Sequence, residues 1–581
     1  MIRSWIEDVR NLWKKKSYCL ALSLTAILSY GYLITHQTVG IDDTPYAYYF
    51  EEGLAAIVGR WVMFVLNKFV HIADFAPFVT ELAAVLIFMA AVSVWCVLMK
   101  RILGERIPDV GYLLFSCLFL SNPLLSEVFP YYLHNGVATG YLFCGISLCC
   151  FWEAVNVRGS GRIGLLKNLK YLGLSAVSLW IAVGCYESFM IVYLTAVCIV
   201  LCSARMAQGR TSRRRAECSE SDDQAQDADS IVPVSLSLCK AAAAAIAAII
   251  LRSVAVSLIT AVFGLQYLQD DAVHRSLTEM IGWMLEPGAL SEFAMILKRV
   301  YVMYGVFGLA YYPIGIYVLA AAAAAVVSIR RSIRKKDPWI FILMIGSFIA
   351  SYLLVLIEGK ATLYRSAQFL PLYSAWGCLM AVMAVNAAAS LLHKKKLPRV
   401  GRFLQRLIVF ILCVILWNQC TDMNKWFYVD DLKYEDAKNT MNQISYELEK
   451  NFDCSKPIVF TGTYKIPKSI IEDAYVEYGS GTYHLMHRLT DFVDEHLLEK
   501  FYREYGVWVA QTPSLSVLDW GRYAFDNDEE LIRFFTMHGH RFKPLLNTEL
   551  YAPAEEYSLT LPSFPQEGSI VDMGDYIIVH F

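Results

Sequence analysis

The sequence predicts a polytopic α-helical membrane protein with about eleven transmembrane helices and a small C-terminal extracytoplasmic α/β domain. Its 581 residues are 56% hydrophobic and 18% charged. The apolar residues gather in blocks of about 18 to 30, which is long enough to cross a hydrocarbon core roughly 30 Å thick. The blocks end near Trp417, and the remaining residues are polar and mixed. We therefore divide the chain into a transmembrane domain, 1–418, and an extracytoplasmic C-terminal domain, 419–581.

Each apolar block is interpreted as one crossing of the membrane. The first block follows the basic stretch Lys14 to Lys16 and has no small-residue cleavage site after it, so we expect a retained helix rather than a signal peptide. The predicted spans are 18–35, 76–99, 110–128, 137–154, 171–185, 187–204, 233–263, 300–328, 338–357, 362–389 and 404–418.

The distribution of Lys and Arg predicts the orientation of these spans. With the N-terminus in the cytoplasm, about 28 positive residues fall on the cytoplasmic side and about seven in the outward loops before the C-terminal domain. The pattern does not reverse along the chain. It requires two crossings in 171–204, with the break at Gly184 to Ser188. The sequence therefore predicts a multi-pass protein of the cell (inner or cytoplasmic) membrane, surrounded by membrane lipid, with a cytoplasmic N-terminus.

Shorter segments carry further predictions. The Ser- and Asp-rich stretch 212–230 indicates a disordered cytoplasmic loop. In the C-terminal domain, 434–451 and 491–505 have the pattern of helices, while 457–461 and 576–581 have that of buried strands. A net charge of −2 gives no field that favours nucleic acid as a partner.

The loop after the first span is the richest in chemically useful side chains. Adjacent Asp42 and Asp43 are followed by Arg60 and Trp61. A carboxylate can accept the proton of an attacking hydroxyl, Arg can neutralise a leaving phosphate, and Trp offers a flat apolar face for a sugar or a prenyl chain. This set suits sugar transfer from a lipid phosphate. Alternatively, Asp42 is the N-cap of a juxtamembrane helix.

Other polar residues are predicted at the outer membrane surface. In the second outward loop, Glu127, Tyr131 and His134 are candidates for contacts with sugar hydroxyls, while an aromatic interface belt is the alternative. Tyr186 and Glu187, which form the break between two spans, are further candidates for substrate binding.

Near later spans, arginines are candidate ligands of a donor phosphate, and Glu358 is a candidate for substrate binding. Arg252 lies within an apolar helix, where it either binds phosphate or pairs with a carboxylate such as Glu187. Glu358 and Arg365 flank a short outward turn, where Arg365 either clamps phosphate or extends to the lipid headgroups.

Several of these motifs, in this order, resemble the type II glucosyltransferase family of phage and bacterial O-antigen modification. They are the run GIDD at 40–43, the GRW at 59–61, Asn122-Pro123, and the break at 186–187. The break is Tyr-Glu here instead of the family's usual Tyr-Gln-like pair, which adds a charge. The resemblance covers about 400 residues.

The resemblance implies a C-type polytopic membrane glycosyltransferase that takes glucose, or another hexose, from a polyprenyl-phosphate carrier. The acceptor would be a cell-surface polysaccharide or a lipid-linked glycan on the outer face of the membrane. Asp42 and Asp43 match the expected position of the general base. Because adjacent residues of an extended strand point to opposite faces, we expect no obligatory metal or other cofactor, although a divalent cation is possible. A transporter or flippase of a lipid-linked sugar is the alternative function.

Overall fold

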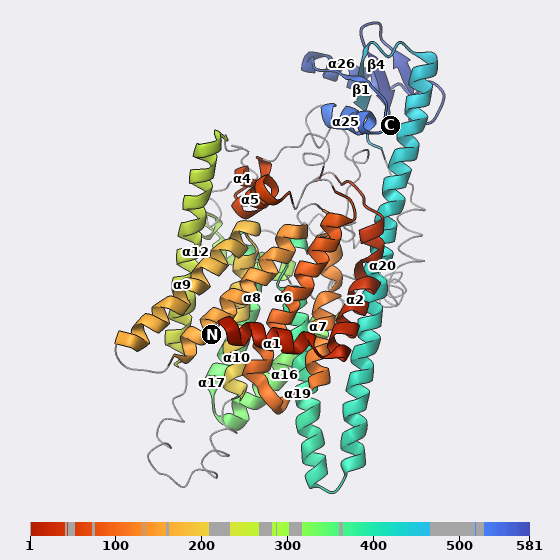
Figure 1. The fold of residues 1–581 in the computed structure, drawn as a ribbon. Helices are drawn as coiled ribbons and strands as arrows, with labels where there is room; N and C mark the ends of the chain where they lie inside the picture. The colour runs from red at the N-terminus through yellow and green to blue at the C-terminus, as the bar shows by residue number, and fades with distance from the viewer. Residues whose placement is uncertain are drawn as a thin grey trace.

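The protein is described by a computed structural model (Figure 1), which is dominated by long helices. The described residues are 2–40, 43, 53–71, 76–131, 134–157, 162–207, 233–265, 282–285, 287–300, 316–358, 364–464, 518 and 528–581. The predicted loop 212–230 and the predicted helix 491–505 lie outside these residues.

Nine helices in the described part of the chain are long and apolar enough to cross a membrane. They are α2 (Lys16–Thr35), α6 (Val79–Leu103), α7 (Asp109–Leu120), which a 3-10 turn (Pro123–Glu127) extends, α8 (His134–Asn156), α9 (Arg162–Cys185), α10 (Phe189–Ala207), α12 (Val234–Phe263), α19 (Leu370–Lys394) and α20 (Pro398–Asn451). Each overlaps a predicted span, and α9 and α10 meet at the predicted break.

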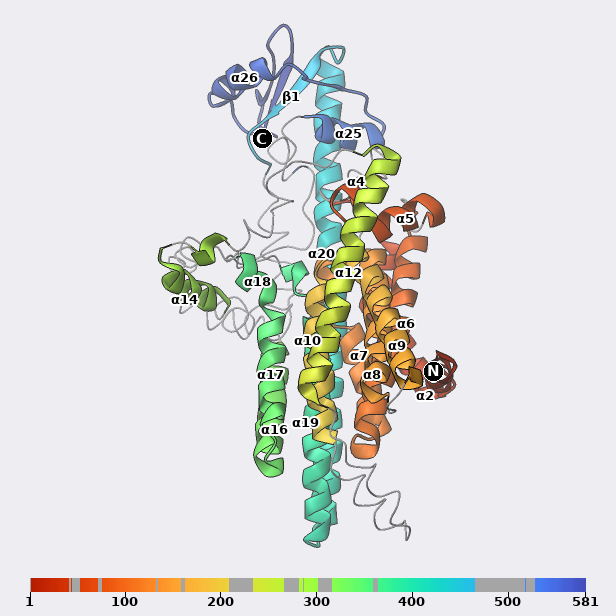
Figure 2. The ribbon, with the colours of Figure 1, turned by 90° about the vertical axis from the view of Figure 1, so that its left-hand side faces the viewer.

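The two other predicted spans overlap helices that are not among these nine. The region of span 300–328 contains α16 (Tyr317–Lys335), which ends seven residues later than predicted. Span 338–357 is divided into α17 (Pro338–Ser351) and α18 (Leu353–Glu358). Figure 2 shows α16 and α17 on one flank of the bundle, with α6, α8 and α9 on the other.

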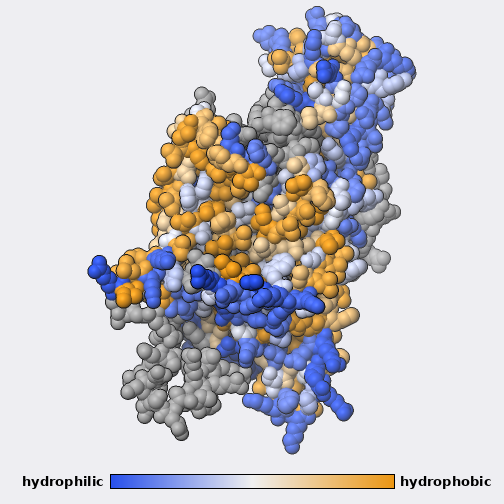
Figure 3. Space-filling model, in the orientation of Figure 1, coloured by the Kyte–Doolittle hydropathy of each residue, from blue (hydrophilic) through white to orange (hydrophobic). Residues whose placement is uncertain are grey.

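Smaller helices lie around this bundle. The amphipathic α1 (Ile2–Trp13) lies across the bundle (Figure 1), and the others are α4 (Leu54–Ile57), α5 (Trp61–Val70) and α14 (Ala289–Val300), together with 3-10 turns at Gly104–Arg106, Gly282–Leu285, Tyr364–Ser366 and Thr548–Leu550. Apolar side chains cover much of the visible bundle surface between α1 and the C-terminal domain (Figure 3). This belt is what a lipid-facing surface requires.

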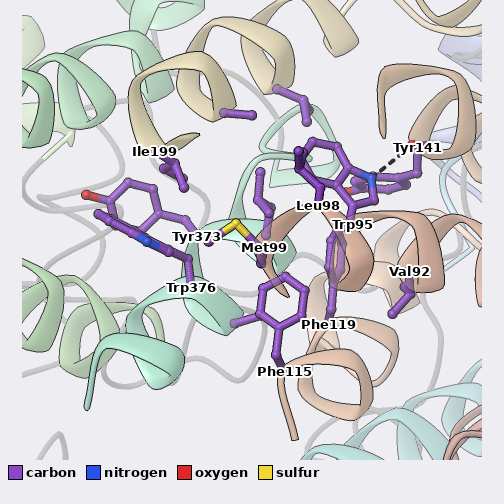
Figure 4. Packing of buried hydrophobic residues seen from close by; sticks show 14 of the residues in the cluster. Val92, Trp95, Leu98, Met99, Phe115, Phe119, Tyr141, Ile199, Tyr373 and Trp376 are labelled. Carbon is purple, nitrogen blue, oxygen red and sulfur yellow. Dashed lines mark hydrogen bonds between the residues drawn. The ribbon is translucent and has the colours of Figure 1, made fainter. Parts of the chain in front are cut away.

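The interior of the bundle is packed with aromatic side chains. Trp95, Tyr141 and Trp376 are almost fully buried, and Trp95 Nε1 donates to the carbonyl oxygen of Tyr141 at 3.0 Å (Figure 4). Small residues allow close approach elsewhere, since a Cβ atom on Gly377 of α19 would lie 2.3 Å from the carbonyl oxygen of Ala320 in α16. Such contacts hold membrane helices together where the hydrophobic effect between them is weak.

Helix α20 joins the bundle to the C-terminal sheet. The predictions placed a span end at 418 and a separate helix at 434–451, but one continuous helix of 54 residues covers both. Met423, Phe427, Met441 and Leu448 are all buried, so an apolar stripe continues through the polar stretch between the two predicted elements. At 1.5 Å per residue the helix is about 80 Å long.

The C-terminal sheet has four strands in the order β2-β1-β4-β3. They are β1 (Pro457–Thr461), β2 (Lys543–Pro544), β3 (Ile570–Asp572) and β4 (Ile577–His580), in which β1 pairs in parallel with β2 and β4, while β3 is antiparallel to β4. The strands predicted at 457–461 and 576–581 are thus present. Alternating residues pack against α20 and α25 (Glu529–Met537) on one face and against α26 (Tyr551–Ser558) on the other.

Candidate functional site

Most of the predicted site residues lie at one end of the bundle. We call it the domain end, defined by the C-termini of α2, α7 and α9 and the N-termini of α8, α10 and α19, because α20 extends from it to the C-terminal sheet (Figure 1). The opposite end, which carries α1 and the hairpin between α19 and α20, we call the basic end. Two groups of charged side chains occupy the domain end.

The first group contains two arginines that share one carboxylate. Arg252 Nη2 donates to Glu187 Oε1 at 2.6 Å, and Arg60 Nε lies 3.6 Å from Glu187 Oε2. The Arg60 guanidinium also lies 4.3 Å from the centre of the Tyr186 ring. The pairing of Arg252 with Glu187 was one of the two alternatives predicted for Arg252. The arrangement concentrates positive charge at the α9–α10 break, where an anion could bind by replacing Glu187.

Two glycines provide the space that Arg252 and the Trp61 of the GRW motif occupy. Gly59 has φ +83°, and a Cβ atom there would lie 2.2 Å from Arg252 Nη2. Trp61 stacks on Trp180 of α9 with ring centroids 4.4 Å apart. A Cβ atom on Gly184 would lie 2.1 Å from Trp61 Nε1, so this glycine provides the space for the indole. The motif therefore fixes Arg60 and Trp61 against the break.

The second group surrounds the buried Glu127. This carboxylate interacts electrostatically with Arg365 and Lys433, and with Asp430 as a like charge. Glu127, Asp430 and Lys433 are 5%, 2% and 1% exposed. Glu127 Oε1 accepts no hydrogen bond from any residue that the structure describes. Three protein segments far apart in sequence thus bring charged groups into one buried region.

Tyr131 and His134 belong to this second group. Arg365 Cζ lies 5.4 Å from the centre of the Tyr131 ring, and His134 Nδ1 is hydrogen-bonded to the carbonyl oxygen of Tyr131. Both side chains are buried, at 5% and 1% exposed. They are therefore inside the protein rather than in an aromatic belt at the lipid headgroups, which was the alternative prediction. Whether they contact sugar stays a prediction.

Helices α5 and α8 link the two groups. A Cβ atom on Gly136, in the first turn of α8, would lie 2.3 Å from Met63 Sδ in the first turn of α5. Arg60 immediately precedes α5, and His134 begins α8. The segments that carry the two charged groups are thus in contact through α5 and α8.

The loop with the predicted base begins beside the second group. Thr38 donates from Oγ1 to Asp430 Oδ2 at 2.8 Å, and Val39 is buried in the apolar cluster of the C-terminal sheet. Asp43 is 1% exposed, and its Oδ2 accepts a hydrogen bond from the backbone N–H of Gly40 at 3.0 Å. One oxygen of Asp43 therefore stabilises a turn. Asp42 lies outside the described residues, so its interpretation as an N-cap stays open.

Sequence reasoning missed Asp430 and Lys433. Both lie in the polar stretch after the last predicted span, which was assigned to the C-terminal domain. The apolar residues Met423 and Phe427 continue the helical spacing beyond Trp417. Following that spacing along the chain would have predicted one continuous helix with Lys433 on its buried side. Glu358 ends α18, and its side chain lies outside the described part of the chain.

No group of three or more His, Cys, Asp or Glu side chains suited to a metal ion occurs among the described residues. The prediction that no metal is obligatory is not tested by this observation, because Asp42 and other acidic residues lie outside that part. The cations that the structure does place at the domain end are the side chains of Arg and Lys.

The fold is a helical bundle whose long apolar helices suit a membrane protein, with charged side chains at the end of the bundle that faces the C-terminal sheet. The chain belongs to the glucosyltransferase family described as Glucosyl transferase GtrII, whose model matches residues 31–383. Membership assigns a glucosyltransferase activity. The matched residues include every member of the two charged groups other than Asp430 and Lys433. These two lie in α20, which begins after the match ends. No curated protein and no solved structure matches the chain.

Proposed function

We propose that this glucosyltransferase transfers glucose from a polyprenyl-phosphate carrier to a cell-surface polysaccharide or lipid-linked glycan, at the outer face of the membrane. The observation that carries the proposal is the placement of Arg365 and Lys433 around buried Glu127 at the domain end. Negative charge develops on the leaving phosphate during the reaction, and cations held in a water-poor site stabilise that charge most strongly. The apolar belt beside the site gives a prenyl chain access from the membrane.

The step requires one base and one group that stabilises the departing phosphate. The acceptor hydroxyl oxygen forms a bond to C1 of glucose, the bond from C1 to the phosphate oxygen breaks, and the polyprenyl phosphate keeps the electron pair. The proton of the hydroxyl passes to a carboxylate, for which Asp42 or Asp43 is proposed. Arg60, Arg252 and Arg365 are the proposed ligands of the phosphate, and Trp61 supports the sugar or the chain.

The test is transfer of radiolabelled glucose from polyprenyl-phosphate glucose by the purified full-length protein in detergent. Asp42→Asn, Asp43→Asn and the double variant are compared with Asp453→Asn, an exposed carboxylate of the C-terminal domain. We expect loss of transfer in at least one single variant and in the double variant, with normal expression in the membrane. The Asp453→Asn control should transfer at the wild-type rate.

Two outcomes would contradict the proposal. Full activity in both single variants and the double variant would remove the proposed base. Movement of the lipid-linked sugar in sealed vesicles, without any transfer in detergent, would instead support a flippase.

A further inference from the structure

The C-terminal end of α20 borders a cavity that is separate from the charged site. Its volume is about 790 Å³, and it lies between the last turns of α20 and the segment 564–570, which ends at the first residue of β3. This volume is within the usual range of about 300–1,000 Å³ for ligand sites. The family match ends before both segments, so the family assigns nothing here.

The side chains lining the cavity combine amides with aromatic rings. Asn442, Gln443 and Tyr446 come from α20, while Phe564 and Gln566 come from the other side. An amide presents both a donor and an acceptor, which matches the paired donor and acceptor character of sugar hydroxyls. A Tyr ring offers an apolar face with a polar edge, and the C–H face of a pyranose can pack against such a ring.

The charge of the lining argues for a neutral ligand. None of the residues that line the cavity, all of them within the described part of the chain, is Lys or Arg, whereas Glu447 and Glu567 are present. A phosphate, an acidic polysaccharide or a nucleic acid would meet like charge there. The Tyr446 side chain is exposed, at 61%, and Lys450 Nζ lies 5.3 Å from its ring centre, outside the lining.

The position of the cavity relates it to the charged site through one rigid element. Lys433 of the second charged group and Tyr446 of the cavity are both in α20, 13 residues apart, which corresponds to about 20 Å along the helix axis. Because 13 residues also turn the helix by about 220°, the two side chains lie on roughly opposite sides of α20, and a glycan several sugar units long is needed to reach from one to the other.

We propose that this cavity binds a neutral segment of the acceptor glycan, at a distance from the sugar unit that is modified. This inference rests on the proposed function for the identity of the glycan. It assigns Asn442, Gln443 and Tyr446 to acceptor binding and gives the C-terminal domain a role in selecting long acceptors. The residues hold the acceptor and take no part in bond formation.

The test measures binding of the acceptor polysaccharide in the absence of the donor. It therefore gives a result even if the protein does not transfer glucose from polyprenyl phosphate. The probe is the delipidated surface polysaccharide of the source cells, cut by mild acid into fractions of one to six repeat units. Binding to the full-length protein in nanodiscs is measured by ligand-observed NMR and by titration. We expect longer fractions to bind more tightly, and Tyr446→Ala to raise Kd about tenfold.

Two control variants separate the loss of the Tyr446 ring from a general effect of removing an exposed Tyr. Tyr557→Ala removes an exposed Tyr of α26 outside the cavity and should bind like the wild type. Tyr446→Phe, which keeps the ring, should retain most of the affinity. In the transfer assay Tyr446→Ala should raise the KM for long acceptors with little change in kcat. Failure of the wild-type protein to bind any fraction, or equal binding by Tyr446→Ala, would overturn the inference.

Discussion

The two ends of the helix bundle use the same types of charged residue in different ways. At the basic end, Arg101 pairs with Asp8 and with Glu153, and its guanidinium lies 3.7 Å from the centre of the Trp5 ring. These contacts attach α1 to α6 and α8, and the carboxylates of the pairs are 45% and 28% exposed. At the domain end, Glu127, Asp430 and Lys433 are almost completely buried, and Arg365 beside them is partly buried.

This difference separates charges that attach helices from charges that a ligand can use. A half-exposed ion pair costs little to form and contributes about 0–1 kcal/mol. A buried group of charges carries a large desolvation cost, so it persists where a function requires it. We therefore expect substitutions at the domain end to reduce transfer, and substitutions at the basic end to affect stability alone.

The largest expected effect is that of Arg365→Ala. Removing the cation next to Glu127 should lower the rate of glucose transfer by about 10²–10³-fold, because the leaving phosphate loses a pre-positioned donor. Arg101→Ala is the matched control at the basic end, and it should lower the temperature of unfolding while keeping the turnover of folded protein. Radiolabel transfer and thermal unfolding of both purified variants provide the measurement. Equal loss of turnover in the two variants would remove the distinction between the ends.

A smaller effect is expected from the pair of arginines at the α9–α10 break. If Arg60 and Arg252 bind the donor phosphate, Arg252→Met should raise the KM for the donor about tenfold, the value of one charge-assisted hydrogen bond. Glu187→Gln should lower that KM, because both arginines lose the carboxylate that competes with phosphate. Steady-state kinetics with varied donor concentration test both variants. A rise of KM in Glu187→Gln would show that Glu187 positions the arginines instead.

Much of the membrane architecture could be predicted because its signals are local. Apolar length located the nine helices of the described residues that are long and apolar enough to cross a membrane, and the break at 184–188 followed from the basic flanks on both sides. The continuity of α20 could not be predicted in this way. Its buried stripe contains Asp430 and Lys433, and a hydropathy pattern interprets such residues as exposed. Their burial depends on partners more than 300 residues away, Thr38 for Asp430 and Glu127 for Lys433.

The candidate site was predicted as a set of residue types and not as a geometry. The pairing of Arg252 with Glu187 was one of two alternatives suggested by the sequence, but only the fold shows that Arg60 shares the same carboxylate. The role of Gly184 was also hidden, because a glycine at a helix break already has a local explanation. The contact with Trp61, 123 residues earlier in the chain, is a tertiary constraint.

That constraint gives a prediction of intermediate size. Gly184→Ala places a Cβ atom 2.1 Å from Trp61 Nε1, so the stack of Trp61 on Trp180 must shift. We expect a loss of about 1–3 kcal/mol of stability, as for other overpacked sites, with a reduced rate of transfer. Gly173→Ala in the same helix is the control, because no atom lies within 4 Å of a Cβ atom there. Thermal unfolding of both variants measures the difference, and equal unfolding temperatures would contradict it.

The smallest effect is expected at the basic end, where Lys15 pairs with Asp109 at 2.7 Å. The hydrogen bond to Asp109 raises the pKa of Lys15 above its ordinary value of 10.5. While Asp109 is ionised, the contribution of this pair to stability is fully present up to pH 10.5 and is lost as the pH rises through the higher folded-state pKa of Lys15. Because the Lys15 and Asp109 side chains are 45% and 66% exposed, Lys15→Met should cost at most about 1 kcal/mol at pH 7 and leave transfer unchanged. Unfolding temperatures of the wild type and Lys15→Met should differ by the same small amount from pH 6 to pH 9. A large loss of transfer in Lys15→Met would mean that the basic end also takes part in function, and the two ends would no longer be distinct.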